Sequence, residues 1–216
     1  MKLEEKMKKT YLFDFDGTLV DSMPTYIKIM LDILDEEGIS YTSDIVKIIT
    51  PLGYYGAAQY YQTLGVKTPV DELSQTMRSR ALNAYTYDIG AKDGVIDALY
   101  ELKKNGCDLN VLTASPHSTL DPCLKRLGIW DLFTNVWSCE DFGTTKSDPE
   151  IYIAAAERIG VAKENVIFID DNINAVTTAK TAGMISYAVF DESSSDMIDE
   201  LRAASDRYIY SFNELI

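Results

Sequence analysis

Short apolar runs recur along the chain and alternate with stretches in which apolar residues return at helical spacing. The runs are rich in Val, Ile, Phe and Tyr and do not alternate strictly with polar residues, which is typical of strands covered on both faces. They predict five strands, at residues 11–16, 109–114, 135–140, 165–170 and 186–190. Helices that close at a glycine are predicted at residues 94–105, 148–160 and 174–182. Strands alternating with helices predict an α/β fold with a doubly wound, Rossmann-like parallel sheet.

Residues 23–88 interrupt this alternation. They predict consecutive helices, with no strand pattern among them, at residues 24–37, 43–49, 53–64 and 70–84. A helical insertion between the first and second strands implies a second, smaller domain. The predicted organisation is therefore a core domain of residues 1–22 and 89–216 and a small all-helical cap domain of residues 23–88.

The composition indicates an acidic globular protein. Among 216 residues, 46% are hydrophobic and 25% are charged, and the formal net charge is -14. This charge disfavours binding to nucleic acids and to anionic membranes, and a site for an anionic substrate would need a local cation. Three separated cysteines do not make a disulfide scaffold. No long apolar run follows the charged start, so neither a signal peptide nor a membrane span is expected. We expect a cytoplasmic monomer or weak homodimer.

The first predicted strand ends in two acids, Asp14 and Asp16. Residues two apart in a strand point to the same side of the sheet. Two carboxylates there repel each other and favour a cation between them, and an oxygen-only pair suits Mg²⁺. Taken alone, the pattern also fits two solvent-exposed acids, so the remaining motifs decide the interpretation.

Four motifs, in order, resemble those of the haloacid dehalogenase superfamily. The string YLFDFDGTLVDS matches the first motif at every signature position. The other three motifs, VLTAS, KSDPEIY and VIFIDDN, supply Thr113, Lys146, Asp170 and Asp171. The resemblance covers residues 11–184. It is to the phosphatase branch in which a helical cap follows the first motif, as in phosphoglycolate phosphatases and β-phosphoglucomutases.

The chain departs from the family pattern at two positions. Ser147 stands where the third motif commonly has Pro, at a position without a chemical role. Ala175 stands where many members have a further Asp after the fourth motif. The adjacent pair Asp170 and Asp171 is an accepted variant of that motif, so the expected metal site is retained.

The resemblance implies catalytic and phosphate-binding roles. Asp14 would be the nucleophile that forms an aspartyl-phosphate, and Asp16 the general acid and base. Thr113, the main-chain N–H of Ala114, and Lys146 would bind the phosphate oxygens.

The resemblance also implies a magnesium site. Mg²⁺ would be held by Asp14, the main-chain carbonyl of Asp16, and Asp171. Asp170 would lie beside the ion or support its ligands. In the predicted cap, the turn at residues 50–55 is expected to face the substrate, with Gly53 and Tyr54 as possible contacts.

The predicted function is Mg²⁺-dependent hydrolysis of a small phosphorylated metabolite, such as a sugar phosphate or phosphoglycolate. A phosphosugar isomerase similar to β-phosphoglucomutase is an alternative, because such relatives share the motifs. A non-catalytic binding protein on the same fold is another. Dehalogenases and phosphonate-cleaving members usually lack the second Asp of the first motif, so Asp16 argues against both.

Overall fold

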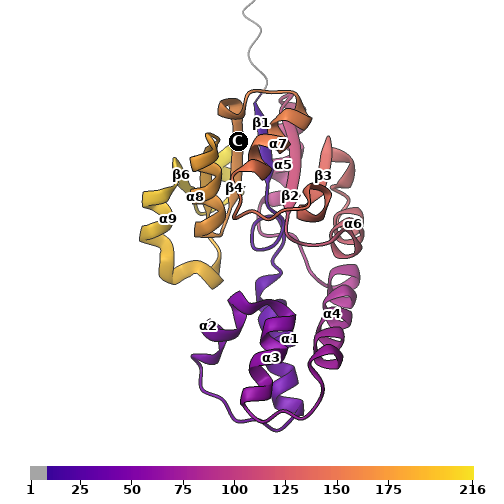
Figure 1. The fold of residues 1–216 in the computed structure, drawn as a ribbon. Coiled ribbons are helices and arrows are strands. Elements are labelled where there is room, and N and C mark those ends of the chain that lie inside the picture. Colours follow the sequence, from indigo (N-terminus) through magenta and orange to yellow (C-terminus); the bar gives the residue numbers. More distant parts are fainter. Residues whose placement is uncertain (1–8) are drawn as a thin grey trace, which may run out of the picture. The chain divides into compact units, whose positions relative to one another are not determined.

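The computed structural model describes residues 9–216, which form two compact units. One unit comprises the described residues up to Asp21 together with Gly90–Ile216, and the other comprises Ser22–Ile89. The described strands all belong to the first unit, whereas the second is helical (Figure 1). The role of the helical unit as a cap stays a prediction.

The first unit is built on one sheet of six described strands, which pair in parallel in the order β3-β2-β1-β4-β5-β6. Their bounds are β1 Thr10–Phe13, β2 Asp108–Thr113, β3 Asn135–Ser138, β4 Val166–Asp170, β5 Ile185–Val189 and β6 Arg207–Ile209. The predicted α/β fold with a parallel, Rossmann-like sheet is confirmed. The sequence prediction missed β6. This edge strand has only three residues, and three residues are too few to show the hydrophobic pattern of a strand.

Helices cover both faces of the sheet. The α-helices are α5 Val95–Lys104, α6 His117–Arg126, α7 Glu150–Ile159, α8 Ile173–Ala182 and α9 Ile198–Ala204. Short 3-10 helices lie at η2 Trp130–Leu132, η3 Cys139–Phe142, η4 Lys163–Asn165, η5 Glu192–Met197 and η6 Phe212–Leu215.

Alternation along β1 sends its side chains into two cores. Leu12 joins Phe168 and residues of α7 and α8 in a buried cluster on one face. Phe13 points to the other face, where its ring lies 5.9 Å from that of Phe212 and 6.4 Å from that of Phe133. Burying each such side chain contributes roughly 1.5–3 kcal/mol. This double burial fixes β1 at the centre of the sheet and thereby fixes where its last residues emerge.

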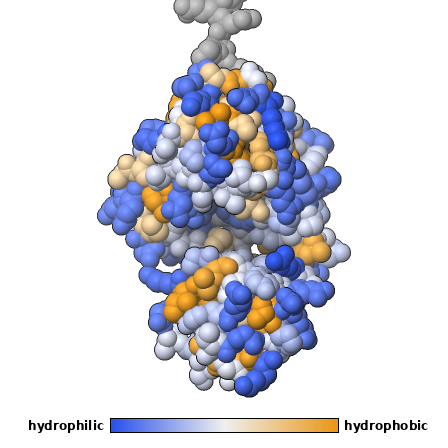
Figure 2. All heavy atoms as spheres, viewed as in Figure 1, coloured by the Kyte–Doolittle hydropathy of each residue, from blue (hydrophilic) through white to orange (hydrophobic). Residues whose placement is uncertain are grey.

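The second unit has its own helical core. Its elements are α1 Met23–Glu36, α2 Ile45–Ile49, η1 Thr50–Leu52, α3 Gly53–Thr63 and α4 Val70–Tyr87. Tyr61 is fully buried between helices, and its hydroxyl donates to the carbonyl of Met30 at 2.9 Å. Hydrophobic atoms also gather on the surface around α2, where Ile48 is 39% and Leu52 43% exposed (Figure 2). None of the described helices has the length and apolar character to cross a membrane.

Candidate active site

The turn after β1 carries the first two acids. The amide of Asp14 continues the sheet ladder by donating to the carbonyl of Ile169 at 2.9 Å. The chain then folds back, with the amides of Leu19 and Val20 both donating to the carbonyl of Phe15. Gly17 has a φ of 72°, and a Cβ there would lie 2.6 Å from a carboxylate oxygen of Asp171. Only glycine fits this close approach without displacing the acid.

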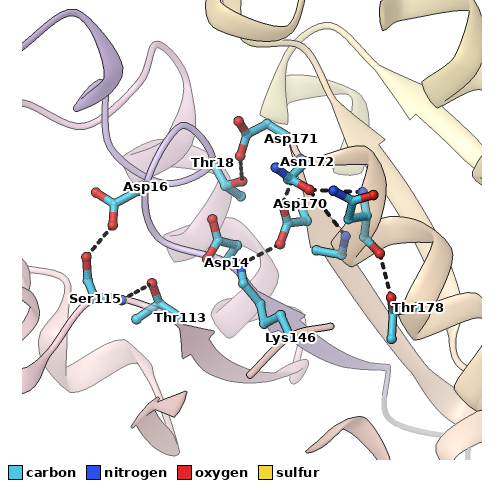
Figure 3. A network of polar contacts seen from close by, with 12 residues as sticks. Asp14, Asp16, Thr18, Thr113, Ser115, Lys146, Asp170, Asp171, Asn172 and Thr178 are labelled. Atoms are coloured by element: carbon cyan, nitrogen blue, oxygen red, sulfur yellow. Dashed lines mark hydrogen bonds and ion pairs between the residues drawn. The ribbon is translucent and has the colours of Figure 1, made fainter. Parts of the chain in front are cut away.

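Three buried carboxylates meet at the ends of β1 and β4 (Figure 3). Oxygen atoms of Asp14, Asp170 and Asp171 lie within 4.8 Å of one another. Asp170 ends β4 and accepts from the amide of Asn172 at 2.7 Å, and Asp171 accepts from the Thr18 hydroxyl at 3.1 Å. The sequence predicted that Asp170 lies beside the metal or supports the metal ligands. In the structure, the carboxylate of Asp170 is itself one of the three buried carboxylates.

Lys146 supplies the positive charge in this group. Its Nζ lies 2.5 Å from Asp14 Oδ1 and 2.7 Å from Asp170 Oδ2. Tyr152 of α7 donates to the main-chain carbonyl of Lys146 at 3.0 Å and holds its loop in place. Burial lowers the pKa of Lys146, but attraction to the two carboxylates outweighs burial and raises that pKa well above its usual value. The side chain is therefore a fixed cation.

The charges in this group do not balance. Three carboxyl groups face one lysine, so full ionisation of the three would leave two negative charges in excess. Burial is the main reason that the pKa of Asp171 lies well above its usual value, and repulsion from Asp170 and Asp14 adds to it. The pKa of Asp170 is raised too, mainly by burial, although Lys146 opposes the rise. A divalent cation would restore balance, and carboxylate oxygens are the donors that Mg²⁺ prefers. The residues present therefore fit such an ion.

Asp16 and the end of β2 lie on the other side of Asp14 (Figure 3). The side chain of Asp16 is not in the three-carboxylate group. Its Oδ2 accepts a hydrogen bond of 2.5 Å from the hydroxyl of Ser115. The amide of Ser115 in turn donates to Thr113 Oγ1 at 3.1 Å, across the exposed Ala114. Sequence reasoning missed Ser115 as a partner of Asp16, although the residue stood within the second motif.

Gly53 and Tyr54 belong to the helical unit. Gly53 has a φ of 64° and open space around the position of a Cβ. The ring of Tyr54 lies 5.0 Å from that of Tyr26. Their predicted contact with substrate stays a prediction.

Comparison with known proteins is consistent with this arrangement. A family model described as haloacid dehalogenase-like hydrolase matches residues 8–183. The pyrophosphatase PpaX of Bacillus velezensis is 30% identical over 184 residues, 84% of this chain and 82% of that protein. The phosphoglycolate phosphatase of Shigella boydii is 30% identical over 193 residues, 79% of this chain and 77% of that protein. A solved HAD family hydrolase of Deinococcus radiodurans, with bound phosphate and sodium, has the same fold. Its TM-score is 0.79 at 21% identity, over 96% of this chain and 93% of that one.

The chain's single histidine lies near this site, at the start of α6. This residue is His117. Its Nδ1 lies 2.7 Å from Asp121 Oδ1 and its Nε2 2.8 Å from Asp141 Oδ2. The hydrogen bond to Asp121, followed by the one to Asp141, raises the pKa of His117. The imidazole ring thus joins α6 to η3.

This contact predicts a pH-dependent stability. Because folding raises the pKa of His117, its stabilisation is fully present below the pKa of the unfolded chain and is lost as pH rises through the folded pKa. We expect His117→Gln to lower the free energy of unfolding more at about pH 5.5 than at about pH 9. Urea denaturation at the two pH values measures the difference. An equal loss of unfolding free energy at the two pH values would show that His117 stabilises the fold without its positive charge.

Proposed function

The chain is a phosphatase of the haloacid dehalogenase-like hydrolase family, and we propose that it hydrolyses a small phosphorylated metabolite with Mg²⁺, through a phosphorylated Asp14. The family membership confirms the resemblance predicted from the four motifs. The observation that carries the proposal is the buried group of Asp14, Asp170, Asp171 and Lys146. A sugar phosphate or phosphoglycolate is the proposed kind of substrate, since one relative is named a phosphoglycolate phosphatase.

Asp14 is the proposed nucleophile. Lys146 holds one of its oxygens at 2.5 Å and fixes the direction of the carboxylate. A carboxylate oxygen attacks phosphorus in line with the leaving oxygen, so that an acyl-phosphate bond forms as the ester bond breaks. Water then attacks the phosphorus of this intermediate and regenerates the carboxylate.

Asp16 is the proposed general acid and base. In the first step its carboxyl proton passes to the leaving oxygen, and in the second step its carboxylate takes a proton from the attacking water. The hydrogen bond from Ser115 holds this carboxylate apart from the three buried ones. Two acids of one motif thereby take different partners and different roles.

Thr113, Ala114 and Lys146 are the proposed phosphate-binding groups. Thr113 Oγ1 accepts from the amide of Ser115, which directs its own hydroxyl hydrogen toward another acceptor. A phosphate oxygen is a suitable acceptor for that hydrogen and for the main-chain N–H of Ala114. Lys146 adds a positive charge directly beside Asp14, although the chain as a whole is acidic.

Asp14, Asp171 and the main-chain carbonyl of Asp16 are the proposed ligands of Mg²⁺, with Asp170 beside them. When bound, the ion supplies positive charge that neutralises phosphate oxygens during transfer. The residues of the chain provide the direction of attack and the proton transfers.

Variants of the two acids test the proposal. With Mg²⁺ and a panel of phosphorylated metabolites, the wild type should release inorganic phosphate. Asp14→Asn should lower kcat about a thousandfold or more, because an amide does not attack phosphorus. Asp16→Asn should lower kcat by about 10²–10⁴-fold and accumulate phosphorylated protein, visible by mass spectrometry.

Asp97→Asn, an exposed acid on α5, is the matched control and should keep full activity. An active Asp14→Asn protein would exclude the covalent route. Isomerised sugar phosphate in place of inorganic phosphate would support the mutase alternative instead.

The helical unit provides a second test, of substrate selection. Closing a site excludes water and selects the leaving group, and the turn at residues 50–55 is proposed to do so. In Gly53→Ala the added Cβ would lie in open space, but alanine would have to adopt the positive φ of Gly53. We therefore expect this variant to lose about 1–2 kcal/mol of stability. Tyr54→Phe keeps the ring contact with Tyr26 and should cost little stability.

Both variants should raise KM and change the ranking of metabolites. Small aryl phosphates, which need few contacts with this unit, should be affected less. Kinetics on the metabolite panel, with thermal unfolding in parallel, measure both effects. If the variants lost much stability and the ranking of metabolites as substrates did not change, Gly53 and Tyr54 would belong to the helical core and would not contact substrate.

A further inference from the structure

A second lysine of the sheet unit, Lys92, is held by three acceptors. Its Nζ lies 2.6 Å from the carbonyl of Gly17, 2.6 Å from the carbonyl of Phe190 and 2.8 Å from Asp191 Oδ2. An ammonium group has three N–H donors, so these bonds use all of them. The side chain is 17% exposed. Lys92 lies outside the four motifs and is therefore not explained by the proposed chemistry.

The backbone around Lys92 runs along the turn that carries the acids. Its amide donates to the carbonyl of Leu19 at 3.1 Å, and Ala91 forms an antiparallel bridge with Val20. The amide of Asp21 donates to the carbonyl of Gly90 at 3.0 Å. The segment is therefore fixed beside the turn, and the lysine side chain reaches from it to the turn's Gly17 carbonyl.

Gly17 is the residue at which this turn contacts Asp171, one of the three buried carboxylates. Its Cα lies so close to Asp171 that an added Cβ would be 2.6 Å from the carboxylate. The preceding residue is Asp16, whose main-chain carbonyl is a proposed metal ligand. A shift of the Gly17 peptide therefore moves both Asp16 and the packing surface of Asp171.

Asp191 keeps the ammonium group in place. It is buried, and its Oδ1 accepts from the amide of Ser193 at 3.0 Å and from the Ser193 hydroxyl at 2.6 Å. With Oδ1 held by Ser193, Oδ2 is directed to Lys92. The end of β5 thus anchors the lysine, and the lysine anchors the turn after β1.

We propose that Lys92 is a positioning residue of the active site, which holds the Gly17 turn so that Asp16 and Asp171 together bind a divalent cation. This inference rests on the proposed function. In this proposal Lys92 acts by holding the turn in place and not by its charge. A positioning role and a purely electrostatic role predict opposite effects on cation binding. Removing a nearby positive charge should tighten cation binding by electrostatics alone, whereas releasing the turn should weaken it.

Binding of Mn²⁺ to protein freed of metal, followed by electron paramagnetic resonance, tests the proposal without relying on turnover. Lys92→Met, which keeps the length of the side chain without donors, should weaken Mn²⁺ binding by about 10–100-fold. It should also lower kcat with little change in KM. Lys92→Gln keeps two N–H donors, and its Mn²⁺ affinity should fall between those of the wild type and Lys92→Met. If Lys92→Met does not fold, Lys92→Gln tests the proposal in its place.

Lys103→Met is the matched control. Lys103 also donates to a main-chain carbonyl, that of Leu132 at 2.6 Å, but it lies on α5 away from the acids. This variant should bind Mn²⁺ like the wild type. The double variant Lys92→Met/Asp191→Asn removes the unpaired charge of Asp191 and should bind as weakly as Lys92→Met.

The outcomes separate the two proposals. Equal or tighter Mn²⁺ binding by Lys92→Met and Lys92→Gln, with a functional wild type, overturns the positioning role alone. A wild-type protein that binds no divalent cation overturns both the positioning role and the metal-dependent function.

Discussion

Repulsion among buried carboxylates is the constraint on which this site depends. Asp14, Asp170 and Asp171 lie within 4.8 Å of one another and away from water, and Lys146 offsets only part of their charge. Such a group destabilises the metal-free fold, so it persists only where the surrounding structure holds it. The same repulsion favours the binding of a divalent cation, as the proposed function requires.

The sheet provides that support. β1 and β4 are adjacent and buried on both faces, and their register places Phe13 opposite Ile169 directly before the acids. The hydrophobic cores on the two faces therefore determine the distance between Asp14 and Asp170. Side chains near the strand ends then complete the arrangement: Thr18 donates to Asp171, and Ser115 keeps Asp16 apart.

Much of this was predictable from the sequence, because strands and motifs are local. The predicted parallel sheet brought distant strand ends, and with them Asp14 and Asp170, to one edge. Alternation along a strand at residues 11–16 predicted Asp14 and Asp16 on one side, but β1 ends at Phe13 and the side chain of Asp16 lies outside the three-carboxylate group. The edge strand β6 and the contacts of Ser115 and Lys92 were not predictable. Each depends on partners far along the chain, such as Asp191 for Lys92, that no local pattern identifies.

The most direct test of this account is the thermal unfolding of wild type and Asp171→Asn, each with and without Mg²⁺, at neutral pH. The account predicts that Mg²⁺ raises the Tm of the wild type by relieving the repulsion. It also predicts that Asp171→Asn melts above the wild type without metal and gains nothing from Mg²⁺. A wild-type Tm that ignores Mg²⁺, or a metal-free Asp171→Asn protein that melts below the wild type, would contradict it.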